Sequence, residues 1–368
     1  MSTESLPMPS VSGNLPDGAG EDRPRELAVR TTDDVLSFFG SLFGSLGAVW
    51  IVYGELLPEH GLLGFIVCWY LSFLALYTAV TAMSHPRPVV VDRLMRAIIC
   101  AGAGIVAFAL ATTIIYTFVR GWPALHHMNF YTQDMNAVQP TDPLTRGGVL
   151  HAVVGSLIEL AIATAVALPL GIATAVYMTE VGGPLARTVR TVVEAMTALP
   201  DLIAGLFVYT LLIVGLGMQK SGLAAAIALT ITMLPIIARS AELSLRVVPG
   251  GLREAGLALG APKWRMVWRV VLPTAGAGLA TALILAFARA VGETAPVLIT
   301  SGASTYFNTN PVNNPMNSLP LFVYSGVRSG EPNFITRAFG AASLLLIIVL
   351  VVFVLIRFLA SRQKGSVR

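Results

Sequence analysis

Apolar runs long enough to cross a lipid bilayer constrain this chain more than any other feature. A transmembrane α-helix needs about 20 consecutive, mostly apolar residues. Runs of roughly that length lie at about 35–57, 61–83, 97–118, 149–178, 190–214, 222–245, 272–299 and 336–360. We therefore expect an all-α, polytopic membrane protein with eight spans.

The composition agrees with a membrane location. Of the 368 residues, 55% are hydrophobic and only 12% are charged, which is unusual for a soluble protein. The net charge of +4 is modest and the basic residues concentrate in alternate loops, so nucleic-acid binding explains the basic pI poorly. Residues 1–34 are rich in Pro, Gly, Ser and acids, which predicts a disordered tail with no cleaved signal.

Lysine and arginine alternate from loop to loop, and this alternation sets the expected orientation. Loops 84–96 and 179–190 are basic, and the most basic loop joins the runs that end at Leu245 and begin at Leu272. Loops with an excess of Lys and Arg stay in the cytoplasm. We therefore expect both termini in the cytoplasm, with the long loops 119–148 and 300–335 outside.

The first two runs differ from the other six. They are rich in aromatic residues and carry no charge beyond their ends. We expect a cytoplasmic tail (1–34), an accessory transmembrane hairpin (35–96), a first core helix with an outer loop (97–148) and a main permease body (149–361).

No sequence pattern for catalysis is present. The chain has no GxxxxGK[ST] stretch for nucleotide binding, and its five histidines have no metal-ligand spacing. No Ser, His and acid set suggests a hydrolase. We expect a chain that is not itself an enzyme and holds no metal or cofactor.

The most basic loop contains an ordered motif, REAGLALGAPKWRMVWRVVLP, at Arg253–Pro273. Glu254 and Ala255 begin a small-residue helical turn, Gly260 follows, and Pro273 opens the next apolar run. A short helix with small residues fits a partner's cleft, Glu254 can meet a partner's cation, and Gly260 permits a sharp turn. The alternative is a basic loop that only enforces topology.

Two ionisable residues lie inside the run 272–299. Arg289 and Glu293 are four residues apart and should share a helix face. Charges within a membrane are costly and usually functional. Small residues that permit close helix packing recur beside Arg289, at Gly278, Ala282, Ala286 and Ala290. Arg289 should therefore point into the protein or a pore; the alternative is a structural ion pair.

Two further acids are candidates for a substrate path. Pro200 should break the run 190–214, and Asp201 follows it directly. A broken helix inside a membrane frees backbone groups that can line such a path. Glu159 lies at a similar depth in the run 149–178, with no partner evident. For Asp201 the favoured alternative is a packing kink with a hydrogen bond to a neighbour.

Several stretches together resemble a known family. The loop with Glu254-Ala255, Gly260 and Leu272-Pro273 resembles the EAA loop of ABC-type import permeases. With ARAVGETAPVLIT, ALPDLIAGLFVY and VALPLGIATAVYMTE, it is similar to the phosphate ABC-importer permease of the PstA type, over about residues 97–361. The chain departs from that pattern in Asp201, where the family tends to have Ser, in Gly256 where it has Ala, and in the two added runs.

The resemblance implies a type I ABC importer transmembrane fold with six core helices, preceded here by the two-helix hairpin. It implies an inner-membrane heterodimer with a PstC-like permease, two ABC ATPase subunits that hold ATP and Mg, and an external phosphate-binding protein. In that assembly Arg289 would supply positive charge for phosphate and Glu293 would position it. Glu254, Ala255, Gly260 and Pro273 would dock the ATPase.

There are three alternatives to phosphate import. The same charged residues would also suit a permease for another oxyanion, such as sulfate, molybdate or phosphonate. An ion-coupled secondary transporter or channel would be favoured by an inverted internal repeat, and none is found. A membrane scaffold would need neither Glu254 nor Arg289.

Overall fold

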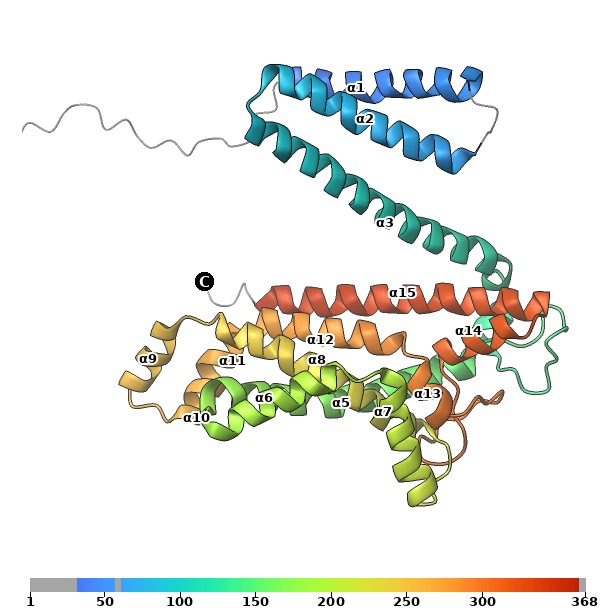
Figure 1. Cartoon of the computed structure of the whole chain (residues 1–368). Coiled ribbons are helices and arrows are strands. Elements are labelled where there is room, and N and C mark those ends of the chain that lie inside the picture. The colour runs from blue at the N-terminus through green and yellow to red at the C-terminus, as the bar shows by residue number, and fades with distance from the viewer. Residues whose placement is uncertain (1–31, 57–60, 364–368) are drawn as a thin grey trace, which may run out of the picture. The chain divides into compact units, whose positions relative to one another are not determined.

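The computed structural model describes residues 32–56 and 61–363, and these residues form helices joined by loops, without a strand (Figure 1). The chain divides into two compact units, Met1–Ala109 and Leu110–Arg368. The boundary falls inside one long helix, α3 (Arg87–Leu125). Of the expected tail, residues 1–31 lie outside the described residues, and α1 begins at Thr32.

The expected number of membrane spans is reached only by counting bent helices. Six helices of the described residues are long and apolar enough to cross a membrane, and two bent helix pairs bring the number to eight. The straight spans are Asp34–Gly54, Leu62–Ser84, Arg87–Leu125, Leu150–Val181, Gly222–Arg246 and Pro332–Phe358.

In the first unit, the hairpin expected from the sequence is formed by α1 (Thr32–Ile51) and α2 (Leu62–Ser84). The turn η1 (Val52–Leu56) continues α1. Aromatic rings fill the contact between the two helices: Phe38 lies edge-on to Phe73 and to Tyr77, with ring centroids 5.5 and 5.8 Å apart. Phe38, Phe73 and Tyr77 therefore pack these helices against each other, whereas other aromatic residues of the two runs, such as Phe43 and Trp50, are exposed.

The second unit is centred on α5 (Leu150–Val176) and α8 (Gly222–Arg246). On α8 packs α12 (Gly276–Val291), and α15 (Pro332–Gln363) runs alongside α12 (Figure 1). Small side chains make these contacts close. The expected stripe on α12 is buried at Ala282, Ala286 and Ala290, and a Cβ on its first member, Gly278, would lie 2.5 Å from Ser244 Oγ of α8.

The predicted break at Pro200 is confirmed. The segments Pro184–Thr197 (α6) and Asp201–Gly215 are bent by 102°. The second segment consists of α7 (Asp201–Val208) and the π-helical η3 (Tyr209–Gly215).

The run 272–299 departs from its expected form at both ends. The segment Lys263–Thr274, made of α10 (Lys263–Met266), η4 (Val267–Val271) and α11 (Leu272–Thr274), is bent by 71° from α12. Pro273 therefore precedes a bend inside the span instead of opening it. The run breaks again before α13 (Ala295–Thr300), so Glu293 lies between helices and not on the face of α12.

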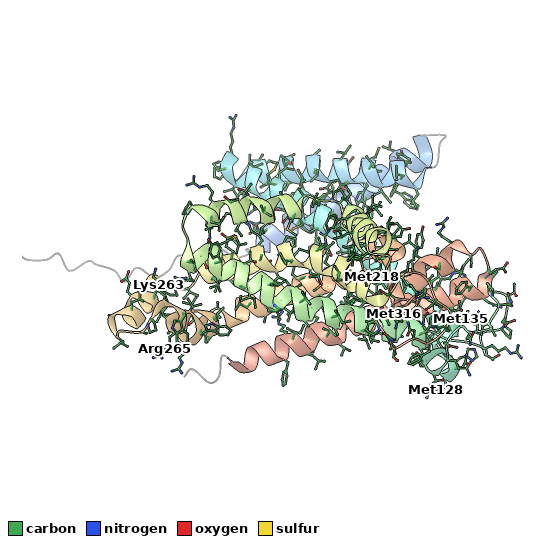
Figure 2. The ribbon with its side chains drawn as sticks, turned by 90° about the horizontal axis from the view of Figure 1, so that it is seen from below. Met128, Met135, Met218, Lys263, Arg265 and Met316 are labelled. Carbon is green, nitrogen blue, oxygen red and sulfur yellow. The ribbon has the colours of Figure 1, made fainter. Side chains whose placement is uncertain are left out.

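The expected outer loops and the basic loop lie at opposite ends of the second unit. Figure 2 shows Lys263 and Arg265 at one end and Met135, Met218 and Met316 at the other. The outer loops include the short helices α4 (Met128–Thr132) and α14 (Leu319–Arg328). The basic loop includes α9 (Gly250–Ala258).

Candidate functional site

A cluster of three charges lies where two broken helices meet. Arg289, in the last turn of α12, has its Nη2 2.6 Å from Asp201 Oδ2 and its Nε 3.3 Å from Glu293 Oε1. Asp201 is the first residue of α7, and Glu293 lies in the break before α13. The guanidinium thus bridges two carboxylates. The ion pair with Glu293 is the alternative that the sequence left open for these two residues, and the bond to Asp201 fits the alternative of a kink with a hydrogen-bonded neighbour.

The local folding around Pro200 brings these residues together. Helix α6 ends at Thr197, and Pro200 is the residue that caps the start of α7. Asp201 is the first residue of α7, where the positive end of the helix dipole stabilises its negative charge. Gly205 allows α7 to lie directly on α13, because a Cβ there would be 2.5 Å from Pro296 Cα. The contact between Gly205 and Pro296 therefore sets the distance between Asp201 and the segment that carries Glu293.

The cluster is open on one side. The exposed fraction of the side chain is 52% for Arg289, 24% for Asp201 and 14% for Glu293. Arg289 and Asp201 line a pocket together with Thr197 and with Thr232 and Pro235 of α8. A charge facing lipid inside a membrane costs at least about 2.5 kcal/mol. The open side of Arg289 therefore suits a water-filled path or another protein chain.

Glu159 belongs to a second polar network. Its side chain is buried, and Ser301 Oγ lies 2.6 Å from Glu159 Oε1 and also bonds the carbonyl oxygen of Met316. Glu159 and Glu293 both line one small cavity, so the two networks adjoin. The partner that the sequence did not reveal for Glu159 is thus Ser301, which is 142 residues away along the chain.

Glu159 is one of several polar residues by which α5 holds residues 301–319 of the outer loop 300–335. Ser156 Oγ accepts a hydrogen bond of 2.7 Å from the backbone nitrogen of Leu319. His151 Nε2 lies 3.4 Å from Asn317 Nδ2, and a Cβ on Gly155 would collide with the Asn317 carbonyl oxygen. These α5 residues recur at helical spacing in the sequence, which could have indicated a shared polar face of the helix. That polar face was not predicted.

The EAA-like loop forms the expected short helix and turn. Glu254 and Ala255 are exposed in α9, and Gly260 has φ +77°, in the left-handed region that favours glycine. The structure explains why position 256 has glycine where the resembled family has alanine, because a Cβ there would lie only 3.1 Å from Met266 Cγ of α10. Two large apolar side chains of this loop are also exposed, Leu259 at 89% and Trp264 at 63%. Exposed apolar groups gathered in this way suit a protein partner.

A further charge cluster lies near the C-terminal end of α8. Glu242 is fully buried, with Arg190 of α6 at 2.8 Å, Arg239 at 3.0 Å and Arg246 at 2.7 Å. Arg239 and Arg246 reach Glu242 from the same helix, three and four residues away, whereas Arg190 comes from a distant part of the chain. Three cations around one buried carboxylate tie α6 to α8 beside the basic loop.

Comparison with known proteins places this geometry in context. Residues 167–365 match the model of the family described as "Binding-protein-dependent transport system inner membrane component". Phosphate transport system permease protein PstA 1 of Mycobacterium tuberculosis (strain CDC 1551 / Oshkosh) is 40% identical over 249 residues, 67% of this chain and 81% of that protein. PstA of Xylella fastidiosa (strain 9a5c) is 37% identical over 224 residues, 60% of this chain and 78% of that protein.

One solved structure shows the same fold. It is a bacterial alginate ABC transporter in complex with an alginate pentasaccharide-bound periplasmic protein, with a TM-score of 0.56 and 15% identity. The match covers 74% of this chain and 95% of that one. At that identity the likeness concerns the arrangement of helices alone.

Proposed function

The chain belongs to the family of binding-protein-dependent transport system inner membrane components, and from this premise we propose that it is the permease subunit of an ATP-driven phosphate importer. It is a multi-pass protein of the inner membrane. The substrate follows from relatives named phosphate transport system permease protein PstA.

The observation that carries a transport role is the half-exposed Arg289, held by two carboxylates beside the bend at Pro200. Its planar fork donates hydrogen bonds in pairs, as the tetrahedral oxygens of phosphate require. We propose that phosphate replaces Asp201 as the partner of Arg289 while Glu293 keeps the side chain in position. Glu159, on the wall of the adjoining cavity, completes the proposed substrate path.

The partners follow from the family and from the two ends of the second unit. We propose that Glu254, Ala255, Gly260 and Pro273 dock one of two ABC ATPase subunits, which hold ATP and Mg. A PstC-like permease would cover the open side of Arg289, and an external phosphate-binding protein would rest on the outer loops. In this arrangement both termini face the cytoplasm, since the basic loops lie there.

Labelled phosphate uptake, normalised to assembled complex, tests the role of Arg289. Arg289→Gln should assemble but lose uptake, and Arg289→Lys should retain less uptake than the wild type because it keeps the charge without the fork. Arg96→Gln is the matched control, since Arg96 pairs with Asp92 of its own helix in the first unit and has no role in the proposed path.

A double variant separates transport from a structural ion pair. Arg289→Gln with Glu293→Gln removes one charge of each sign and should insert, assemble and remain inactive. Recovery of uptake in that double variant would contradict the proposal. Competition with sulfate, molybdate and phosphonate in the same assay should leave phosphate uptake largely unaffected if phosphate is the substrate.

A further inference from the structure

Arg253 joins the helix α9 to two transmembrane helices. Its Nη2 and Nε lie 2.8 and 3.1 Å from Glu180 Oε1. The same guanidinium donates from Nη1 to the Val248 carbonyl oxygen at 2.7 Å and from Nη2 to the Leu245 carbonyl oxygen at 2.8 Å. One side chain thus has partners at the ends of two other elements.

The positions of these partners explain how one side chain reaches two transmembrane helices. Glu180 lies in η2 (Tyr177–Val181), which continues α5, and its side chain is only 7% exposed. Leu245 is in the last turn of α8, where backbone carbonyls lack helical partners and a cation is favoured. Arg253 therefore pairs with the end of α5 and caps the end of α8 at the same time.

Arg253 also lies next to the exposed Glu254, which faces outward from the same helix. Within residues 250–258, all of which the structure describes, Arg253 is the only side chain with a hydrogen bond to α5 or α8. The helix that receives the ATPase is thus bonded to the transmembrane body through this guanidinium.

The two helices that Arg253 contacts also carry residues that line the cavities beside Arg289, Asp201 and Glu293. Thr232 and Pro235 of α8 line the pocket of Arg289 and Asp201, and Glu159 of α5 borders the cavity of Glu293. We propose that Arg253 and Glu180 form a coupling bridge, which carries movement of α9 into α5 and α8 and so links ATP hydrolysis to opening of the path. This inference rests on the proposed function and adds two positioning residues to the proposed docking residues Glu254, Ala255, Gly260 and Pro273.

The test uses the whole importer reconstituted in liposomes, with its ATPase subunits, partner permease and binding protein. Arg253→Gln and Glu180→Gln should still copurify with the ATPase and hydrolyse ATP. The phosphate imported per ATP hydrolysed should fall at least about fivefold, the lower end of typical coupling between sites. Glu180→Gln is the milder change, because it leaves both carbonyl bonds of Arg253 in place.

Arg187→Gln is the matched control. It removes the same charge from another basic loop, where Arg187 of α6 is exposed and outside the proposed docking loop, and it should leave the import per ATP unchanged. The double variant Arg253→Gln with Glu180→Gln removes both charges and should stay uncoupled.

Three results would overturn the bridge: wild-type import per ATP in assembled Arg253→Gln, restored coupling in the double variant, or loss of the ATPase from both single variants. The second would show a purely structural ion pair, and the third a purely docking role. Failure of the proposed function would look different, because the wild-type importer would then take up no phosphate.

Discussion

At the scale of single residues, the partners of Arg289 decide how strongly it can bind an anion. Asp201 departs from the serine of the resembled family and occupies one side of the guanidinium at 2.6 Å. In the proposed path, an incoming phosphate would have to compete with that carboxylate, which carries the same sign of charge. Asp201 would then lower the affinity of the path for its substrate.

Asp201→Ser should lower the KM for uptake. An ion pair as exposed as this one contributes roughly 0.2–1 kcal/mol, so its removal should strengthen substrate binding by up to about fivefold. Uptake measured over a range of phosphate concentrations checks the change, with Asp201→Asn as the charge-neutral comparison. An unchanged or raised KM in both variants would contradict competition between Asp201 and phosphate.

The sequence predicted part of this cluster. Arg289 and Glu293 are four residues apart, so the sequence already offered their ion pair as an alternative, although Glu293 lies beyond the end of α12. Asp201 is 88 residues from Arg289, and its position depends on the 102° bend and on the contact between Gly205 and Pro296. Local patterns do not contain those tertiary contacts, and the bond between Asp201 and Arg289 was therefore not foreseen.

At the scale of elements, close backbone contacts fix the geometry of the site. Gly205→Ala would place a methyl group against the backbone of α13 and push α7 away from Arg289. Overpacking of this kind costs about 1–3 kcal/mol, so the melting temperature of the purified complex and its uptake should both fall. Gly102→Ala, in a position with open space around it, is the control. Equal melting temperatures and uptake in the two variants would refute this role for Gly205.

The docking helix offers a second prediction at this scale. Glu254 is exposed and bonds no other described residue of this chain, so Glu254→Lys should leave insertion and folding unchanged. The reversed charge should repel the partner's cation and abolish both copurification of the ATPase and uptake. A variant complex that still copurifies and transports would show that Glu254 does not dock the ATPase.

At the scale of the whole molecule, the alternation of basic loops predicts which face each loop occupies. With Cys68 and Cys100 replaced, single cysteines at Asn136 and Asn310 should react with an impermeant reagent added outside intact cells. Cysteines at Arg187 and Ala258 should react only after the membrane is opened. All four positions are exposed, so access depends on the side of the membrane. One reactive site on the wrong side would require a different topology.

The sequence predicted the eight apolar runs because hydropathy and length depend on local composition alone. It did not predict the 71° bend before α12, since Pro273 was expected to open a helix and instead precedes that bend. Nor did it predict that Glu159 would meet Ser301 of the outer loop, a contact that depends on how distant segments pack. Bends and partners of this kind arise from tertiary packing.

The two carboxylates around Arg289 affect whether phosphate could leak back out of the cell through the proposed path. With both ionised, two negative charges and one positive charge give the cluster a net charge of −1. In the proposed path this net negative charge would repel free anions, so stored phosphate inside the cell would not run back down its gradient. A rearrangement that separates Asp201 from Arg289 would leave the pair of Arg289 and Glu293 with a net charge of zero and end that repulsion, so the direction of flow depends on when the separation occurs.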